Sequence, residues 1–285
     1  MKLIGTVAVL GTGLLGASLA RALKKFGVAE KVFAWSRSES TREKCAALPS
    51  VFDGVLDSPE AAVRDADMVV ICAPTANIPQ LAERIAPSLK KGAVITDVGS
   101  VKKSVCEQCE KALAGSGAVF VGSHPMAGSE KIGIDHSDSD LFAGRPCFIT
   151  PSSDAQADAA DLLEKIWTAV GMRAYRATPS VHDSIVARVS HLPHIVAGLL
   201  CCSAADFENG DLRNYAGPGF RDSTRISSGN PEIWDSIIAD NRAEILAALK
   251  IFSDKLSSII DAVENSDSEK IGAMLRKAKS YRDKL

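Results

Sequence analysis

The sequence has no long hydrophobic run and almost no net charge. Its longest apolar stretches, such as residues 195–202, are far shorter than the ~20 apolar residues that a membrane-spanning helix needs. The formal net charge is −2, with acidic and basic residues interspersed, so no strong field exists to attract nucleic acid or an anionic membrane. The apolar segment near the N-terminus is typical of a strand rather than of a signal peptide. These absences predict a cytoplasmic protein whose partners are small molecules and other copies of itself.

The spacing of the cysteines also indicates neither a disulfide framework nor a metal site. The seven cysteines are an odd number, scattered along the chain and mostly in apolar surroundings, which favours a reduced compartment. Cys106 and Cys109 have the CxxC spacing, but no second pair accompanies them. We therefore expect core thiols and no bound metal.

A nucleotide-binding fingerprint stands at the N-terminus. A strand-like run at residues 7–10 leads directly into a GxGxxG turn and then into an apolar segment. The first glycine permits the turn, the second lets the backbone approach a pyrophosphate, and the third lets the helix pack on the strand. The alternative, a glycine-rich turn without a ligand, does not account for the second strand-like run that follows at βαβ spacing. The turn residues expected to bind a dinucleotide are Gly11, Thr12, Gly13, Leu14, Leu15 and Gly16.

The residues after the second strand favour NADP over NAD. An Asp or Glu at this position usually binds the ribose of NAD, whereas this sequence has Ser36, Arg37 and Ser38. A guanidinium beside hydroxyl groups suits a 2′-phosphate. NAD stays open as the alternative, with Arg37 stacked on the adenine or in solvent and Glu39 reaching the ribose.

Strand-like and helix-like runs alternate through the first part of the chain, as in a doubly wound α/β sheet. The strand-like runs are residues 7–10, 31–35, 68–73, 93–98, 118–121, 146–150 and 173–176. Beyond residue 179 no strand is predicted, and apolar residues recur every three or four positions, as in amphipathic helices. We predict a Rossmann-type dinucleotide-binding domain over residues 1–177 and an all-α substrate and dimerisation domain over 178–285. Its wide apolar faces predict a homodimer.

Three polar loops are expected at the carboxyl ends of the strands, where open α/β sheets bind ligands. Ala73, Pro74 and Thr75 should pass near the cofactor. Ser100 offers a hydroxyl that contacts substrate or caps a helix. His124 follows a strand-like run, and neutral imidazole is well matched to accept a hydroxyl proton as a hydride leaves the same carbon. The fingerprint and this histidine together predict a dehydrogenase with His124 as general base.

One polar cluster in the helical segment is rich in histidine. It begins at His182 and Asp183 and includes His191 and His194. The two later histidines have no HExxH spacing and no third ligand, which argues against a metal. We expect them to face the substrate or to be structural.

A second polar cluster contains Arg221, Asp222 and Arg225. The two arginines lie one helical turn apart if the segment is helical, and a guanidinium in a closed cleft is a natural carboxylate clamp. For Arg225 the alternative is a structural ion pair with Asp222.

Five motifs, in this order, resemble the prephenate/arogenate dehydrogenase family of tyrosine biosynthesis. They are GTGLLG from residue 11, DVGSVK from 97, GSHPMAGSE from 122, SHLPH from 190 and GFRDSTR from 219. The resemblance covers nearly the whole chain. It implies that His124 and Ser100 bind the ring C4 hydroxyl and that Arg225 binds a substrate carboxylate. It further implies four residues that shape or gate the pocket: Glu130, His191, His194 and Asp222.

The resemblance implies oxidative decarboxylation of prephenate to 4-hydroxyphenylpyruvate, with hydride transfer to NAD(P)⁺. Arogenate is the alternative substrate, because Ser36 and Arg37 resemble NADP-using members whereas His194 resembles prephenate-using ones. A β-hydroxyacid dehydrogenase or imine reductase would share the fold but needs a catalytic lysine in the helical domain, for which the sequence offers no candidate. A protein that binds NADP without turnover is the alternative outside the enzymes.

Overall fold

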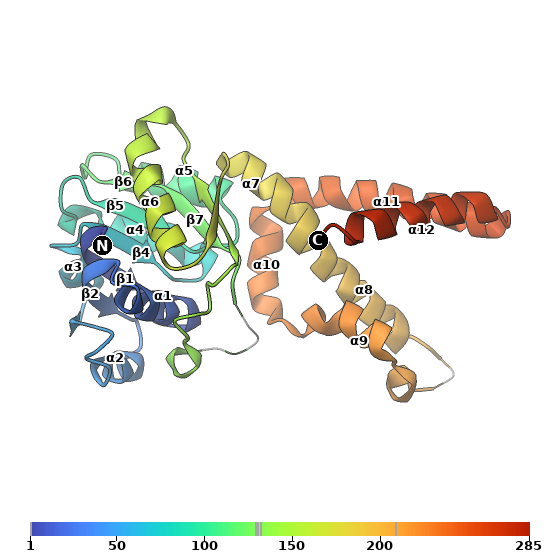
Figure 1. Ribbon diagram of the computed structural model, residues 1–285, viewed down its shortest axis with the longest axis horizontal. Helices are drawn as coiled ribbons and strands as arrows, with labels where there is room; N and C mark the ends of the chain where they lie inside the picture. Colours follow the sequence, from blue (N-terminus) through green and yellow to red (C-terminus); the bar gives the residue numbers. More distant parts are fainter. Residues whose placement is uncertain (1, 129–130, 132, 209) are drawn as a thin grey trace.

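The computed structural model describes residues 2–128, 131, 133–208 and 210–285, which form a sheet-containing body and a helical body (Figure 1). The strands are β1 (Ile4–Leu10), β2 (Ala29–Trp35), β3 (Gly54–Val55), β4 (Met68–Ile71), β5 (Val94–Asp97), β6 (Val119–Phe120), β7 (Gly122–Pro125), β8 (Pro146–Thr150) and β9 (Arg173–Arg176). The helices of the first body are α1 (Leu14–Lys25), α2 (Glu39–Ala46), α3 (Pro59–Val63), α4 (Ile78–Ile85), α5 (Lys103–Ala112) and α6 (Ala157–Ala169). Those of the second are α7 (Pro179–Val186), α8 (Leu192–Ala205), α9 (Pro218–Thr224), α10 (Pro231–Asp240), α11 (Arg242–Glu264) and α12 (Ser268–Arg282).

The main sheet has six parallel strands in the order β3-β2-β1-β4-β5-β6, which is the Rossmann order. Parallel strands with helices on both faces are buried on both sides, so their sequences are nearly continuous apolar runs. The four residues of β4 are all buried, as are Val7 to Leu10 at the end of β1. The predicted fold class, a doubly wound α/β sheet followed by a helical domain, is confirmed.

The last three strands form a separate small sheet, which the sequence did not predict. β7 pairs antiparallel with β8, and β8 pairs parallel with β9. At the point where the chain passes from β6 to β7, Gly122 packs closely against β8. A β-carbon on Gly122 would lie 2.6 Å from Thr150 Oγ1, so this close approach requires glycine. His124 therefore lies within strand β7, opposite Phe148, and the expectation of a histidine loop is wrong.

A single continuous helix opens the helical body. It runs from Pro179 to Ala205 through α7, a π-helical turn (Ala187–His191) and α8. By length and composition alone it is apolar enough to cross a membrane, although polar residues interrupt its apolar runs. In Figure 1 it crosses α11, and α11 and α12 project away from the sheet as a helical hairpin.

The helical body leaves much of its apolar surface uncovered. Its buried cluster consists of Ala187, Ile245 and Ala248, within the described part of the chain. Every large apolar side chain that is more than half exposed, among the described residues, belongs to this body: Val181, Val189, Leu199, Tyr215, Ile233, Ile251, Val263, Leu275, Tyr281 and Leu285.

Candidate active site

The fingerprint turn has the geometry that close approach of strand and helix requires. Gly11 has a φ of +100°, and a β-carbon there would collide with the backbone oxygen of Cys72 at the end of β4. A β-carbon on Gly16 would collide with the Gly11 carbonyl. Gly13 is the N-cap of α1, and a β-carbon there would meet nothing within 4 Å. The space before the first turn of α1 is therefore open, and backbone N–H groups at such a helix end suit phosphates.

Ser36 holds this turn in place and does not face a ligand. The backbone N–H of Thr12 donates to Ser36 Oγ at 3.0 Å, and the two hydroxyl oxygens lie 2.6 Å apart. Cys45 Sγ donates to Thr12 Oγ1 at 3.0 Å. Ser36 is only 6% exposed, so the expected contact between its hydroxyl and a 2′-phosphate does not fit the structure.

A cavity of about 440 Å³ lies at the carboxyl ends of β1 and β4. Its lining residues are Leu10, Gly11, Trp35, Arg37, Cys72, Ala73, Pro74, Asn77, Gln80, Leu81 and Arg84. The Arg84 guanidinium lies 5.7 Å from the Trp35 ring centroid, over its face. Arg42 donates to the carbonyls of Ser36 and Arg37 at 2.8 and 3.2 Å, which fixes the loop between β2 and α2.

The other predicted cofactor residues lie around this cavity. Ser38 is exposed at the N-cap of α2, with its hydroxyl 2.8 Å from that of Ser40. Thr75 is buried at the start of the short turn that follows β4, whereas Leu14 and Leu15 are half-buried in the first turn of α1. The residues of the predicted dinucleotide site therefore converge on one edge of the sheet, where parallel α/β sheets bind ligands.

His124 lies at the same edge of the sheet, where β7 passes the end of β5. The backbone N–H of the preceding residue, Ser123, donates to the β5 residue Asp97 at 3.2 Å. The His124 side chain is 8% exposed, and its Nδ1 lies 2.9 Å from Nε2 of His182. Burial lowers the pKa of His124 well below its usual value, and the neighbouring His182 and Lys102 lower it further. This imidazole is therefore neutral at neutral pH.

His182 and Asp183 connect the first helix of the helical body to the nucleotide-binding body. His182 Nδ1 lies 2.7 Å from Asp183 Oδ1, and both residues are buried. The Asp183 carboxylate accepts the backbone N–H groups of Lys102 and Lys103 at 2.8 and 2.9 Å. The sequence pattern alone assigns no role to this pair; its only local signal is two adjacent polar residues in an apolar helix.

The loop that carries Ser100 is fixed by a buried ion pair. Lys102 and Asp97 have fully buried side chains and contact each other directly. Asp97 also accepts the backbone N–H of Gly99 at 2.8 Å. Ser100 itself is half-buried, and its hydroxyl has no partner in the described chain. The alternative role of Ser100 as a helix cap is wrong, because α5 begins three residues later and the Asp183 carboxylate binds its first N–H groups.

His191 presents an unused donor in a buried position. The side-chain amide of Asn241 lies 3.2 Å from His191 Nδ1, and the amide can only donate there. The proton of the neutral His191 ring is therefore on Nε2, which is buried without a partner. Burial lowers the pKa of His191 to about 4. His194 stacks on Trp234 with ring centroids 3.5 Å apart, and His191 meets the same ring edge-on.

The arginine cluster is not brought to His124. Arg225 and Asp222 are exposed, and their segment packs against α8. The described residues contain no ion pair between Arg225 and Asp222, which was the alternative expected for Arg225. Arg221 Nε donates to the Ala216 carbonyl at 3.0 Å. Glu130 lies outside the described residues.

A metal role is not supported for the cysteines or histidines. The described residues contain no group of three or more His, Cys, Asp or Glu side chains placed to hold an ion. Burial raises the pKa of Cys106 to about 12, which keeps this thiol protonated.

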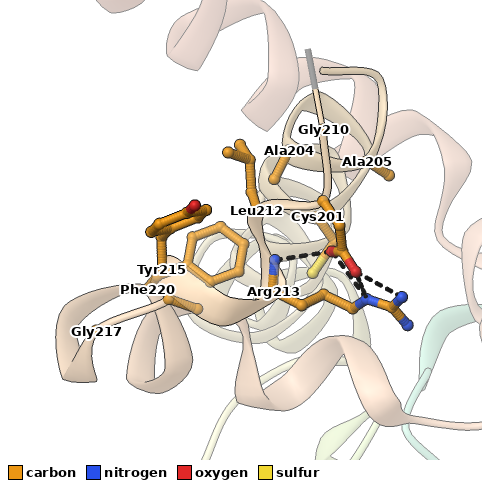
Figure 2. A pocket seen from close by; sticks show the side chains of 11 residues that line it. Cys201, Ala204, Ala205, Gly210, Leu212, Arg213, Tyr215, Gly217 and Phe220 are labelled. Atoms are coloured by element: carbon orange, nitrogen blue, oxygen red, sulfur yellow. Dashed lines mark hydrogen bonds and ion pairs between the residues drawn. The ribbon is translucent and has the colours of Figure 1, made fainter. Parts of the chain in front are cut away.

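A second cavity, of about 790 Å³, lies in the helical body between the end of α8 and the start of α9 (Figure 2). Its walls include Cys201 and the rings of Tyr215 and Phe220, and Arg213 pairs with Asp211 at 2.6 Å beside it. Tyr215 is 83% exposed. None of the predicted catalytic or cofactor-binding residues lines this cavity, so it is a feature of the helical body alone.

Comparison with known proteins identifies the family. Residues 19–176 match the nucleotide-binding domain of prephenate dehydrogenase, and residues 178–277 match its dimerization domain. The chain is 33% identical over 272 residues to cyclohexadienyl dehydrogenase of Zymomonas mobilis, with 94% of this chain and 92% of the relative covered.

Two solved structures share the whole architecture. Prephenate dehydrogenase from A. aeolicus, in complex with hydroxyphenyl propionate and NAD⁺, superposes with a TM-score of 0.90 and 29% identity, over 100% of this chain and 98% of the other. Arogenate dehydrogenase from Synechocystis gives a TM-score of 0.86 and 31% identity, over 98% and 99%. The chain therefore belongs to the prephenate dehydrogenase family and is a nicotinamide-dependent oxidoreductase.

Proposed function

We propose that this protein oxidises prephenate to 4-hydroxyphenylpyruvate and CO₂ in tyrosine biosynthesis, with His124 as the general base. The observation that carries this proposal is a neutral, nearly buried imidazole beside the end of β5, at the sheet edge that holds the fingerprint turn. A base must be unprotonated before it can accept a hydroxyl proton, and burial provides this condition.

The reaction requires one hydride acceptor and one proton acceptor. A nicotinamide cofactor held by the fingerprint turn would supply the acceptor for the hydride of ring C4. His124 takes the proton of the C4 hydroxyl as the carbon–oxygen bond becomes a carbonyl. Loss of CO₂ from C1 then leaves its bonding electrons in the ring, which becomes aromatic, and the ring oxygen recovers a proton from His124. The enzyme's main contributions are positioning and general-base catalysis.

The other site residues have roles that their surroundings support. Ser100 has a free hydroxyl on the loop held by the Lys102–Asp97 pair, which suits a contact with the substrate C4 hydroxyl. The unused Nε2 donor of His191 suits a substrate oxygen. Arg225 remains our candidate for a substrate carboxylate, with His194, Asp222 and Glu130 around the pocket. The Arg225 segment packs against α8 of the helical body and leaves the guanidinium exposed.

We propose NADP as the preferred cofactor. Arg37 is exposed and lines the cavity beside the fingerprint turn, with Arg84 on the same cavity wall. Two guanidinium groups near an adenosine site suit a 2′-phosphate. We therefore assign the binding of this phosphate to Arg37 and Ser38, and no longer to Ser36.

We further propose a homodimer located in the cytoplasm, with domains divided at residues 177 and 178. The half-exposed apolar side chains of the helical body and the open cavity of Figure 2 support burial against a second copy. A partner surface also accounts for the apolar composition of the helix Pro179–Ala205 without a membrane.

The alternative of a β-hydroxyacid dehydrogenase or imine reductase lacks its catalytic group. All six lysines of the helical body are exposed: Lys250, Lys255, Lys270, Lys277, Lys279 and Lys284. The buried lysine, Lys102, belongs to the nucleotide-binding body and is paired with Asp97.

The decisive experiment measures reduced nicotinamide formation by the purified protein, with prephenate and arogenate each crossed with NAD and NADP. Turnover of prephenate supports the proposal. Turnover of arogenate alone would identify arogenate as the substrate instead, and no turnover in any combination overturns the proposal. The His124→Asn variant tests the base: we expect kcat to fall by about 10²–10⁴ while cofactor binding is retained. An unchanged kcat would remove His124 from this role.

A further inference from the structure

We propose that His182 and Asp183 are positioning residues that fix the tautomer of His124 and so keep its Nε2 free to accept the substrate proton. This inference rests on the proposed role of His124 as general base. The three side chains form one hydrogen-bonded chain, with 2.9 Å between the two imidazoles and 2.7 Å between His182 and the carboxylate.

The direction of these hydrogen bonds follows from the chemistry of the carboxylate. An ionised carboxylate only accepts, so the proton of His182 must be on Nδ1, facing Asp183. Burial lowers the pKa of His182, which is therefore neutral, and its Nε2 is an acceptor. His124 must then donate from Nδ1, which leaves the lone pair of its Nε2 unoccupied.

Asp183 is held so that it cannot turn away from His182. Its Oδ1 accepts the N–H of Lys102, and its Oδ2 accepts the N–H of Lys103 at the start of α5. Its backbone carbonyl accepts a hydrogen bond from the Asn241 side chain at 2.9 Å. The side chain is thus fixed in its accepting role.

The relay crosses the boundary between the two bodies. His124 belongs to β7 of the nucleotide-binding body, whereas His182 and Asp183 belong to α7 of the helical body. The tautomer of the base is therefore set only when α7 is docked on α5 and β7.

Asp183→Asn keeps the shape of this side chain but replaces one accepting oxygen with a donor. Both carboxylate oxygens accept α5 N–H groups, and Oδ1 also accepts from His182, so the amide nitrogen of asparagine faces a donor in either orientation. The acceptor that holds the proton of His182 on Nδ1 is therefore weakened, and both tautomers of His124 become accessible. We expect kcat to fall by about 10²-fold, the lower end of the range for losing a correctly prepared base. The KM and the NADP dissociation constant should stay close to wild type.

The tautomer can be observed directly from the ¹⁵N chemical shifts of the histidine rings, with His124 assigned from the spectrum of His124→Asn. The wild type should show His124 protonated on Nδ1, and Asp183→Asn should show a mixture of the Nδ1- and Nε2-protonated forms. A wild-type His124 protonated on Nε2 overturns the proposal whether or not the enzyme turns over prephenate. This readout therefore separates failure of the relay from failure of the proposed function.

Two further variants complete the test. His182→Leu interrupts the relay but leaves Asp183 bound to α5, so it decides the outcome if Asp183→Asn does not fold. It should lower kcat by a similar factor. The control is His136→Asn, which changes an exposed histidine of the nucleotide-binding body and should leave kcat unchanged. A wild-type kcat in His182→Leu contradicts the proposal.

Discussion

The two bodies of this protein bury their apolar residues to very different extents. The nucleotide-binding body has a large buried cluster on each face of its main sheet. The helical body has a buried cluster of only three residues in its described part, and it carries the most exposed large apolar side chains. The first body is therefore complete as a packed unit, whereas the second depends on surfaces outside itself. One such surface is the nucleotide-binding body, which contacts α7 and α10, and the proposed second copy of the chain would provide another.

The largest expected effect tests this difference with two matched substitutions. Leu200 and Phe26 are both 43% exposed, the first on α8 and the second at the end of α1. Leu200→Glu should place two charges in a symmetric interface and weaken dimerisation by roughly 10³-fold, because buried unpaired charges are costly. Phe26→Glu should leave the dimer intact. Sedimentation over a range of concentrations measures the dimer dissociation constant of each variant. Equal constants for the two variants would contradict the proposed difference between the two bodies.

A second prediction concerns the interior of the nucleotide-binding body. Lys102→Met leaves Asp97 buried without its partner and should lower the free energy of unfolding by about 3–5 kcal/mol. Lys90→Met interrupts the half-exposed Lys90–Asp67 pair and should cost at most about 1 kcal/mol. Chemical denaturation followed by circular dichroism measures both values. Similar losses of unfolding free energy in the two variants would show that the buried pair stabilises this body no more than the half-exposed pair does.

A third prediction concerns an acid-sensitive residue of the helical body, His191, which contacts Asn241 and Trp234. Burial lowers the pKa of His191 from 6.5 to about 4, so between these values the unfolded chain binds the extra proton. The stabilisation is complete above about pH 6.5 and decreases as the pH falls toward 4, by roughly 3 kcal/mol for this residue. His191→Gln should flatten that part of the stability profile, and His136→Asn should not. A profile that is equally steep in His191→Gln contradicts the assignment.

The smallest expected effect concerns cofactor choice. Arg37→Ala should raise the dissociation constant of NADP by about tenfold, the loss of one charge-assisted contact, and leave that of NAD nearly unchanged. Arg64→Ala, which changes an exposed arginine of the same body, is the control. Calorimetric titration with both cofactors separates these outcomes. Equal weakening of NAD and NADP would place Arg37 against the adenine or pyrophosphate.

Local patterns predicted the parts of the fold that depend on neighbouring residues. The fingerprint turn and the strands at 146–150 and 173–176 follow from alternation and glycine spacing, and the structure has both strands at those bounds. The sequence did not predict that β7 leaves the main sheet. That change depends on the fit of Gly122 against Thr150, which lies 28 residues away.

The site shows the same limit. His124 was recognisable from its motif, but its partner His182 is 58 residues away, and no local pattern joins the two. Likewise, the cap of α5 comes from Asp183, 80 residues beyond Lys103, rather than from the adjacent Ser100. The Ser36 hydroxyl could bind a phosphate by its chemistry, yet in the structure it is hydrogen-bonded to the Thr12 hydroxyl of the neighbouring turn. Pairings across the sequence, rather than residue types, were the missing information.

The helix Pro179–Ala205 places distant parts of the molecule on one stiff rod. Near its beginning it holds the neighbours of the base, and near its end it lines the open cavity of the helical body with Cys201. The π-helical turn between them inserts one extra residue and rotates the following face by about 100°. In the proposed dimer, this one helix would therefore contact both the second copy and the neighbours of the base. Dilution below the dimer dissociation constant should lower the activity per chain.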